Sequence, residues 1–443
     1  MKIQCSYINQ SDLEYAIETL EMCKQDHAQG CGFNYPYFAP GGGYGKQWWQ
    51  LDSSLALRGY QWVDRKFVET SLLNFIESQK DDGRICLWGS DHLPAIVGGG
   101  NRLTQTLGVS SLPKLFDVAY HIVKCSTDKE LKLSAYKMMK RYIDWWFLNR
   151  QDEETGLLSA VFEETFVPHL GSAGEYAPVD TNVEVYVGCH YASLLAKELQ
   201  IAEDADLLEA RKAQLEQSIN QYLWNEEKGA YYAYLIKEKK LSDRLMASTF
   251  FPLRMNIAGK DRAKKLISQL KNQEHFNWDV LPLTSVSMQD STFTVTVGEY
   301  QGNASWSGSV WTLINEMVVR GLCDCGEVDL AAELAFRTIC VCNHNCAEFI
   351  NPFDGSGHGV IRYGWTASQY LELVIEALFG VAYEANSKTV TISPNIPTQL
   401  KDECFSISGL AVTNDVSIDI AIDHGEVRYS VSDDSVKVVV GCN

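Results

Sequence analysis

The sequence predicts a mainly α-helical protein that ends in a small antiparallel β module. Within the first 380 residues, apolar side chains recur at the spacing of one helix face, in segments separated by polar, glycine-rich or aromatic loops. These amphipathic segments are 11–27, 65–79, 128–150, 181–199, 204–224, 260–271, 308–321, 327–343 and 365–380. Strands and helices do not alternate along this part of the chain, which disfavours a doubly wound sheet or a TIM barrel.

The composition changes after Asn386. The segments KTVTIS, CFSISGLAV, VSIDIAID, VRYSVS and VKVVV alternate apolar and polar residues, which is the period of half-buried strands. The Asp-His-Gly stretch at 423–425 is a hairpin turn signal between two of them. We therefore expect a helical domain over 1–386 and a small β domain over 387–443.

Charge and composition exclude several classes of partner. The chain of 443 residues carries a formal charge of −19, which argues against binding to nucleic acid or to an anionic membrane surface. No stretch is long and apolar enough for a transmembrane helix, and the N-terminus has no basic region followed by an apolar core. The 13 cysteines show no framework spacing, so we expect mostly free thiols and a cytoplasmic protein.

One cysteine-rich stretch, ICVCNHNC, contains residue types that bind zinc. Its members are Cys340, Cys342, His344 and Cys346. Their spacing matches no common zinc pattern, and the sequence offers no second ligand pair at a suitable spacing. We therefore expect no metal site here, and interpret the stretch as a helix end rich in small buried thiols.

The first candidate site is GGGYGKQWWQLDSSLALRGY, residues 41–60. Asp52 follows Tyr44, Trp48 and Trp49 and precedes a helix. Asp52 or Ser53 could simply cap that helix. The same residues also describe a sugar subsite, because aromatic faces stack on a pyranose while a carboxylate accepts hydrogen bonds from its hydroxyls.

Two further stretches carry acids in apolar surroundings. Glu163 and Glu164 are adjacent in GLLSAVFEETFVPH, where burial between aromatic residues would raise the pKa of a carboxyl group, as a general acid requires. A solvated surface turn is the alternative. Asp180, in APVDTNVEVY, fits a helix cap or the wall of a pocket.

The last candidate is Glu348, in CAEFINPFDGSGHGVIRYGWTAS. Asn351-Pro352 interrupts regular structure, glycines follow, and Trp365 stands at the start of a helix. A carboxylate on such a loop can orient a water molecule. An exposed Glu after a helix is the structural alternative.

Together these stretches resemble one known family. WWQLDSSLALRGY, QKDDGRI, PVDTNVEVY, LWNEEKGAYY, SWSGSVWTLINEMVVRGL, AEFINPFDGSG and YGWTAS are similar, in this order, to motifs of (α/α)6-barrel glycoside hydrolases. The clan is the one that holds family 63 glucosidases and mannosylglycerate or glucosylglycerate hydrolases, with trehalases and glycogen-debranching glucosidases as more distant relatives. The resemblance covers most of residues 35–383. It implies a six-hairpin toroid as the catalytic domain.

The resemblance also implies a function, namely inverting, exo-acting hydrolysis of a small α-glycoside or a short oligosaccharide without cofactor or metal. Glu348 falls at the position of the base and Asp52 at that of a substrate-binding aspartate. The segment FEETF replaces the acid motif of the family 63 relatives, and other relatives align either Glu163 or Glu164 with the acid. The aromatic residues implied to hold the sugar are Trp48, Trp49, Trp306 and Trp365. Ser307 replaces an expected arginine.

Two alternatives remain open at this point. The same barrel could carry out a phosphorylase, epimerase or lyase reaction on sugars, although the nine histidines form no clear pair in a site motif. The departures at FEETF and Ser307 would also suit a carbohydrate-binding protein whose active site has decayed. In each case the expected partner is a small carbohydrate.

Overall fold

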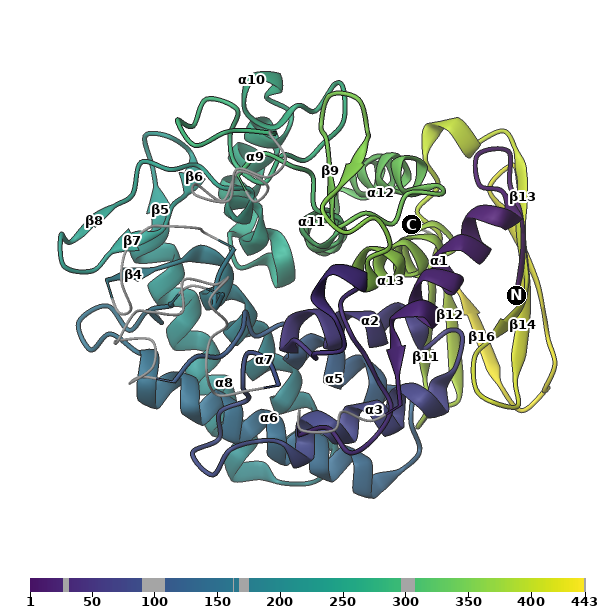
Figure 1. Cartoon of the computed structure of the whole chain (residues 1–443), viewed down its shortest axis with the longest axis horizontal. Coiled ribbons are helices and arrows are strands. Elements are labelled where there is room, and N and C mark those ends of the chain that lie inside the picture. The colour runs from purple at the N-terminus through teal and green to yellow at the C-terminus, as the bar shows by residue number, and fades with distance from the viewer. Residues whose placement is uncertain (27–31, 90–107, 162, 167–174, 296–306, 442–443) are drawn as a thin grey trace.

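The computed structural model describes residues 1–26, 32–89, 108–161, 163–166, 175–295 and 307–441. Its helices form a mainly helical barrel, with a β module packed at one side (Figure 1). The helices are α1 (Gln10–Cys23), α2 (Gln50–Tyr60), α3 (Arg65–Glu77), α5 (Leu115–Lys124), α6 (Lys129–Arg150), α7 (Val179–Glu198), α8 (Ala202–Ser218), η4 (Ala247–Asn256), α9 (Gly259–Leu270), α10 (Gln273–Phe276), α11 (Thr312–Asp324), α12 (Val328–Cys342) and α13 (Gly364–Glu372), with short π segments η3 (Ile219–Leu223) and η6 (Leu373–Leu378). Every helical segment predicted from periodicity overlaps one of them.

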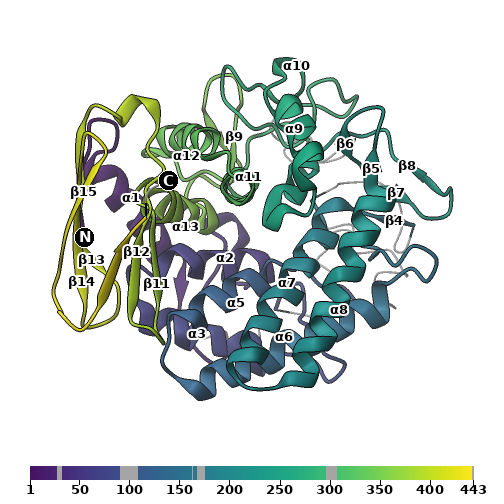
Figure 2. The same ribbon diagram turned by 180° about the vertical axis from the view of Figure 1, so that it is seen from behind.

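The helices lie in two layers. In the inner layer α2 contacts α5, α5 contacts α7, α7 contacts η4, η4 contacts α11, α11 contacts α13, and α13 contacts α2, so the ring closes. Each of α1, α3, α6, α8, α9 and α12 packs outside this ring against at least one inner helix. The ring is visible from both sides (Figure 2).

Helix α2 shows why the inner helices differ from the outer ones. All of its residues are buried, so it has no polar face. At Gly59 it approaches α13 so closely that a Cβ atom would lie 2.0 Å from the Ser368 carbonyl oxygen. The Ser368 hydroxyl accepts a hydrogen bond from the Gly59 amide at 2.7 Å.

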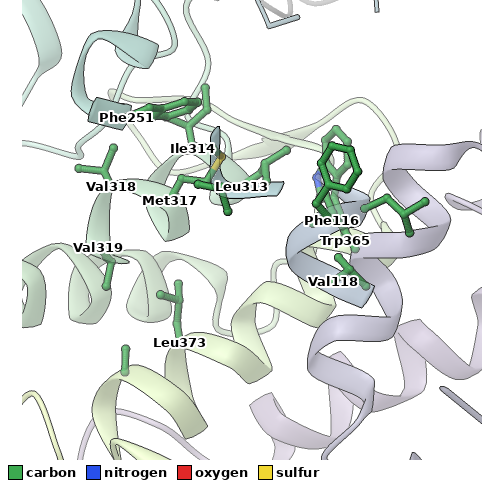
Figure 3. Close-up of a cluster of buried hydrophobic side chains, with 14 of the residues drawn as sticks. Phe116, Val118, Phe251, Leu313, Ile314, Met317, Val318, Val319, Trp365 and Leu373 are labelled. Carbon is green, nitrogen blue, oxygen red and sulfur yellow. The ribbon is translucent and has the colours of Figure 1, made fainter. Parts of the chain in front are cut away.

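The hydrophobic core lies between the inner helices and their neighbours. Ile314 of α11 lies beside Phe251 of η4, and Met317 and Val318 of the same helix lie close by (Figure 3). These side chains are buried to the level of a close-packed interior. The candidate acids lie on loops beside the ring and on the first turns of two inner helices.

The β module contains two sheets (Figure 1). One has the order β1-β13-β14-β15 and the other the order β11-β12-β16. The strands are β1 (Lys2–Gln4), β11 (Val381–Glu384), β12 (Thr389–Ile392), β13 (Cys404–Ala411), β14 (Ser417–Asp423), β15 (Glu426–Val431) and β16 (Lys437–Val440). Strand β12 pairs with β16 in parallel, and the other strand pairs of these two sheets are antiparallel. The module thus includes strands from the start of the chain and from the end of the helical region.

The inner ring also carries a buried network of charges, which we call the arginine-rich end. Arg58 of α2 donates to Glu376 at 2.6 Å and lies 3.7 Å from Glu372. Arg320 of α11 lies 3.2 Å from both of these glutamates and also pairs with Glu316. The same network includes Lys114 and Asp117 at the start of α5, Glu184 of α7 and Arg254 of η4. A cavity of about 460 Å³ opens beside it.

No helix among the described residues is long and apolar enough to cross a membrane. The cysteine-rich stretch lies at the end of α12. His344 pairs with Asp12 at 3.1 Å and stacks on Tyr15, while Cys342 and Cys346 are buried. Among the described residues, one group of three potential metal ligands has its ligand atoms within 4.8 Å of one another, namely Cys404, Asp423 and His424. That group lies on the β module.

Candidate active site

Asp52 lies at the third position of α2, inside the first turn rather than at its cap. The helix cap is Trp49, whose amide donates to the Ser53 hydroxyl at 3.1 Å. Asp52 is 8% exposed, and its carboxylate accepts a hydrogen bond from the Tyr363 hydroxyl. Burial, together with the charge of Glu348, raises the pKa of Asp52 to about 7.

Glu348 lies just before the short strand β9 (Phe349–Ile350) and is buried, with 6% exposure. Its backbone amide donates to the Val360 carbonyl at 2.8 Å. The Tyr44 hydroxyl donates to Oε1 at 2.7 Å and the Val360 amide to Oε2 at 3.2 Å. Burial raises the pKa of Glu348, while these two donors stabilise the ionised form.

Gly359 packs directly against this carboxylate. Its φ of +74° lies in the left-handed region, and a Cβ atom there would lie 2.8 Å from Glu348 Oε2. Strand β9 pairs with β10 (Gly357–His358), and the glycine follows that pair. The loop therefore needs glycine here to bring its backbone beside the acid.

Glu163 lies on a turn with an unusual backbone. Its φ is +69°, a conformation that few residues other than glycine adopt. The Leu112 amide donates to its carbonyl at 2.8 Å, which anchors the turn. Burial raises the pKa of its carboxyl group to about 8, and the charges of Asp52 and Glu348 add to the shift.

Glu164 has a different environment from its neighbour. It is fully buried and forms a two-pronged ion pair with Arg150, with both N–O distances at 2.8 Å. The amides of Ser110 and Val161 also donate to it, at 2.9 and 3.1 Å. Both carboxylate oxygens are therefore occupied by protein donors.

Asp180, the second residue of α7, holds the turn that carries both glutamates. Its carboxylate accepts from the Thr165 hydroxyl at 2.8 and 2.9 Å and from the Phe166 amide at 2.6 Å. The Thr181 hydroxyl donates to the Glu164 carbonyl at 2.6 Å. Burial raises the pKa of Asp180 to about 6. Asp180 thus positions the turn rather than facing outward as a ligand.

Aromatic rings connect the acids into one wall. Neighbouring centroids along the wall are 4.9 to 5.9 Å apart. In spatial order its members are Trp49, Tyr44, Tyr363, Trp365, Trp311 and Phe166. The wall joins the start of α2 to the Glu163 turn.

One of the predicted sugar-binding tryptophans, Trp48, does not belong to this wall. Trp48 is 3% exposed and stacks on Phe33 with centroids 4.1 Å apart and planes 5° from parallel. It also contacts Phe75 of α3, so it is part of the core. Trp306 lies outside the described residues.

The site therefore brings together three carboxylates that sequence analysis proposed, Asp52, Glu163 and Glu348. All three carboxylates act on the Tyr44 hydroxyl. Burial, and then the charges of Glu348, Asp52 and Glu163, raise the pKa of Tyr44 and keep it protonated. No lysine, arginine or histidine of the described residues offsets the raised pKa values of these acids. Such a cluster of desolvated acids is typical of general acid–base chemistry.

Several residues of the site were missed by sequence analysis. Tyr363 stands directly before the GWTAS stretch, so its place beside a recognised motif was an available signal. Gly359 was noted only as part of a glycine-rich loop. Arg150 ends a 22-residue helix and gives no local sign that its partner is Glu164, 14 residues further along.

Comparison with known proteins places the chain among carbohydrate-active enzymes. A family model described as the mannosylglycerate hydrolase MGH1-like glycoside hydrolase domain matches residues 45–165 and 166–366. An uncharacterized protein of Borreliella burgdorferi is 30% identical over 317 residues, which is 70% of this chain and 60% of that protein. A mannosylglycerate hydrolase of Rubrobacter radiotolerans is 25% identical over 177 residues, or 40% of this chain and 39% of that protein.

A periplasmic trehalase of Citrobacter koseri is 25% identical over 247 residues, which is 52% of this chain and 38% of that protein. The matches thus span less than two thirds of the length of these curated relatives. The GH63 mannosylglycerate hydrolase of Thermus thermophilus, solved in complex with glucose, has the same fold. Its TM-score is 0.65 at 21% identity, and the match covers 81% of this chain and 98% of that one.

The helical barrel and these matches place the chain in the class of glycoside hydrolase domains. More narrowly, the chain belongs to the mannosylglycerate hydrolase MGH1-like glycoside hydrolase domain family. The resemblance to family 63 enzymes that the motifs indicated is confirmed.

Proposed function

We propose that the protein is an inverting, exo-acting α-glycosidase in which Glu163 is the general acid and Glu348 the general base. The observation that carries this proposal is the contrast between the environments of the two carboxyl groups. An inverting glycosidase needs one protonated and one ionised carboxyl group on opposite sides of the scissile bond. Environments that push two pKa values apart identify these two roles.

Glu163 suits the acid. Its pKa of about 8 keeps it protonated at neutral pH, and the described residues donate no hydrogen bond to its carboxyl group. It would give its proton to the glycosidic oxygen as the bond from that oxygen to the anomeric carbon breaks. The strained turn holds the side chain in place without using its oxygens.

Glu348 suits the base. The Tyr44 hydroxyl and the Val360 amide donate to it, and both favour the ionised form. It would accept a proton from a water molecule whose oxygen attacks the anomeric carbon on the face opposite the leaving group. The released sugar would therefore be the β-anomer of an α-glycoside.

Glu164 does not suit the acid, although it is adjacent to Glu163. Its ion pair with Arg150 and two amide donors stabilise the carboxylate, whereas a general acid must hold its proton. Its interactions instead connect the turn to the end of α6. We assign it a supporting role.

Asp52 would bind the terminal sugar. It lies next to Glu348 in the acid cluster, and the Tyr363 hydroxyl leaves one of its oxygens available to a sugar hydroxyl. Trp49 and Trp365 belong to the aromatic wall beside it. Asp52 and Glu348 are largely buried at the end of a closed ring, which supports binding of one terminal residue, as an exo-acting enzyme requires.

We also infer that the barrel is a six-hairpin toroid. The closed order of the six inner helices, with an outer helix on each, supports this architecture. The small β domain expected over 387–443, whose sheets also include β1 and β11, would then be an appendage to the catalytic domain. A cytoplasmic location is part of the proposal, and the eleven free thiols in the described part of the chain support it.

The test is hydrolysis of a panel of α-glucosides, α-mannosides, trehalose and glycosylglycerates, followed by proton NMR as the sugar is released. Wild type and the Glu348→Gln variant are compared, with and without phosphate. We expect wild type alone to release a β-anomer. Initial release of the α-anomer would overturn the inverting assignment.

A second outcome separates hydrolysis from its alternatives. Formation of a sugar phosphate only when phosphate is present would identify a phosphorylase. Sugar binding without turnover of any compound would identify a binding protein. Equal turnover by Glu348→Gln and wild type would remove Glu348 from the mechanism.

A further inference from the structure

Resting on the proposed function, we infer that this site selects α-glycosides with an uncharged aglycone and discriminates against an anionic aglycone such as glycerate. The relatives do not decide this point, since one is named for mannosylglycerate, which carries a carboxylate, and another for trehalose, which is neutral. The inference comes from the charges that line the described part of the site.

The first observation is an excess of carboxylates. Asp52, Glu163 and Glu348 act on one another and together on the Tyr44 hydroxyl. When Glu163 is protonated as the general acid, the negative charge of Glu348 remains in the site. Ionised Asp52 adds a second negative charge. An anionic aglycone would enter this field as a like charge in a partly desolvated site, where charges interact more strongly than in water.

The second observation is that Arg150, which pairs with the acid next to Glu163, is not available to a substrate. Both prongs of the Arg150 guanidinium contact Glu164, and its Nη2 atom also donates to the Gly108 carbonyl at 2.8 Å. The side chain is 2% exposed. Freeing it for a ligand carboxylate would leave Glu164 buried without its cation, which is strongly unfavourable.

A second arginine near the site in sequence faces elsewhere. Arg362 precedes Tyr363, but its guanidinium lies over the ring of Tyr15, 3.8 Å from the centroid. It also lies 3.7 Å from Glu18. These contacts hold the Arg362 charge against α1. The hydroxyl of the next residue, Tyr363, instead contacts Asp52.

The groups that do face the acids favour hydroxyls over carboxylates. The hydroxyls of Tyr44 and Tyr363 already donate to Glu348 and Asp52. Carboxylates accept from sugar or alcohol hydroxyls, whereas a ligand carboxylate would receive no hydrogen bond from these two hydroxyls, which the acids already hold. A neutral polyol or a second sugar therefore matches this lining.

Two matched pairs of substrates test the inference. They are α-glucosylglycerate with α-glucosylglycerol, and α-mannosylglycerate with α-mannosylglycerol. Within each pair the molecules differ only in a carboxylate that replaces a hydroxymethyl group. For the pair whose sugar the enzyme accepts, we expect kcat/KM at pH 7 and low salt to be at least about tenfold higher for the neutral member, and the ratio to shrink in high salt.

Binding is measured in parallel by calorimetry on wild type, with the same four compounds, so that selection is read even without turnover. Preference for the anionic member, or a ratio within twofold of one, overturns the inference while leaving the glycosidase intact. If the enzyme turns over neither these four compounds nor any compound of the wider panel, the proposed function is wrong. The binding ratio then still decides the inference, and absence of binding by all four compounds overturns both.

Variants of single charges provide the controls. Asp52→Asn removes one charge of the cluster and should bring the ratio of neutral to anionic substrate closer to one. Binding affinity is compared for this variant, because we expect it to turn over slowly. Asp354→Asn removes an exposed charge on the loop after β9 and should leave the ratio unchanged.

Arg102 is the one lysine or arginine outside the described ranges. If wild type prefers the anionic member and Arg102→Ala loses that preference, Arg102 supplies the missing cation and the inference is wrong.

Discussion

The barrel buries acids in two different surroundings. At the end that holds the candidate active site, burial raises the pKa values of Asp52 and Glu163 to about 7 and about 8. At the other end, burial would also raise the pKa of Glu376, but Arg58 and Arg320 outweigh it and lower the value to about 2. The same residue type therefore has opposite proton affinity within one ring of helices.

Much of the difference comes from arginine. Arg58, Arg254 and Arg320 supply the far end with guanidinium groups from three inner helices, and Asp117 and Glu316 there also have lowered pKa values despite their burial. Burial outweighs the cations at Glu184 and Glu372, whose pKa values stay raised. A buried carboxylate with a cation stabilises a structure only if the pair stays intact. A buried carboxyl group without one keeps a proton that it can give to a substrate. The comparison predicts that substitutions at one end change catalysis and at the other end change stability.

The largest expected effect is at the acid-rich end. Glu348→Gln should reduce kcat by about 10³–10⁴-fold, because the amide cannot take the proton of the attacking water. Its unfolding midpoint should stay close to that of wild type. Glu316→Gln is the matched control at the arginine-rich end, and there the midpoint should fall while kcat is retained. Steady-state kinetics and thermal unfolding of both variants would show whether the two effects separate in this way.

The next effect is on stability. Arg58→Met should lower the free energy of unfolding by about 3–5 kcal/mol, because it leaves Glu376 and Glu372 buried without this cation. Denaturant unfolding at pH 7 measures the loss. Turnover by the folded fraction should stay within a few-fold of wild type. A large loss of kcat without a loss of stability would show that the far end takes part in catalysis.

A smaller effect is expected for the glycine beside the base. Gly359→Ala places a Cβ atom against Glu348 Oε2 and on a backbone with φ of +74°. Displacement of the carboxylate should lower kcat by about 10–100-fold. Gly355→Ala, on the same loop with φ of +72° but with no contact to Glu348, is the control for backbone strain alone. Equal losses of kcat in the two variants would contradict a role of Gly359 in positioning the Glu348 carboxylate.

The smallest effect is a gain in stability at alkaline pH. A pKa raised to about 8 in the folded state means that the favourable contribution of Glu163 is complete below about pH 4.5 and is lost as the pH rises through 8. Glu163→Gln removes this loss, so at pH 9 the variant should be more stable than wild type by about 1 kcal/mol. Thermal unfolding at pH 5 and pH 9 measures the difference. An equal difference at both values would show that its cause is not the charge.

Periodicity predicted the outer helices better than the inner ones. The helices that it missed include α2, α5 and η4, which all belong to the inner ring. All eleven residues of α2 are buried, so no polar face marks the period of the helix. Amphipathic spacing finds a helix that has one side in water, and a helix surrounded by others lacks that signal.

Local sequence singled out the candidate acids but could not separate Glu163 from Glu164. The two are adjacent and chemically identical, and they differ because Arg150 and the Ser110 amide reach one of them. Asp180 was expected to cap a helix or to line a pocket, and its carboxylate accepts a hydrogen bond from the Phe166 amide. These distinctions depend on partners that are distant in the chain, so a single sequence does not contain them.

The most direct test of the central claim is the rate of hydrolysis of an α-glycosyl fluoride, made from the sugar that the enzyme releases, by Glu163→Gln and Glu348→Gln. Fluoride departs without help from an acid, whereas the attacking water still needs a base. We predict that Glu163→Gln hydrolyses the fluoride at a rate within about tenfold of wild type while losing most activity on the natural glycoside, and that Glu348→Gln fails on both. If Glu163→Gln were as impaired on the fluoride as on the glycoside, or if Glu348→Gln hydrolysed the fluoride at the wild-type rate, the assignment of acid and base would be wrong.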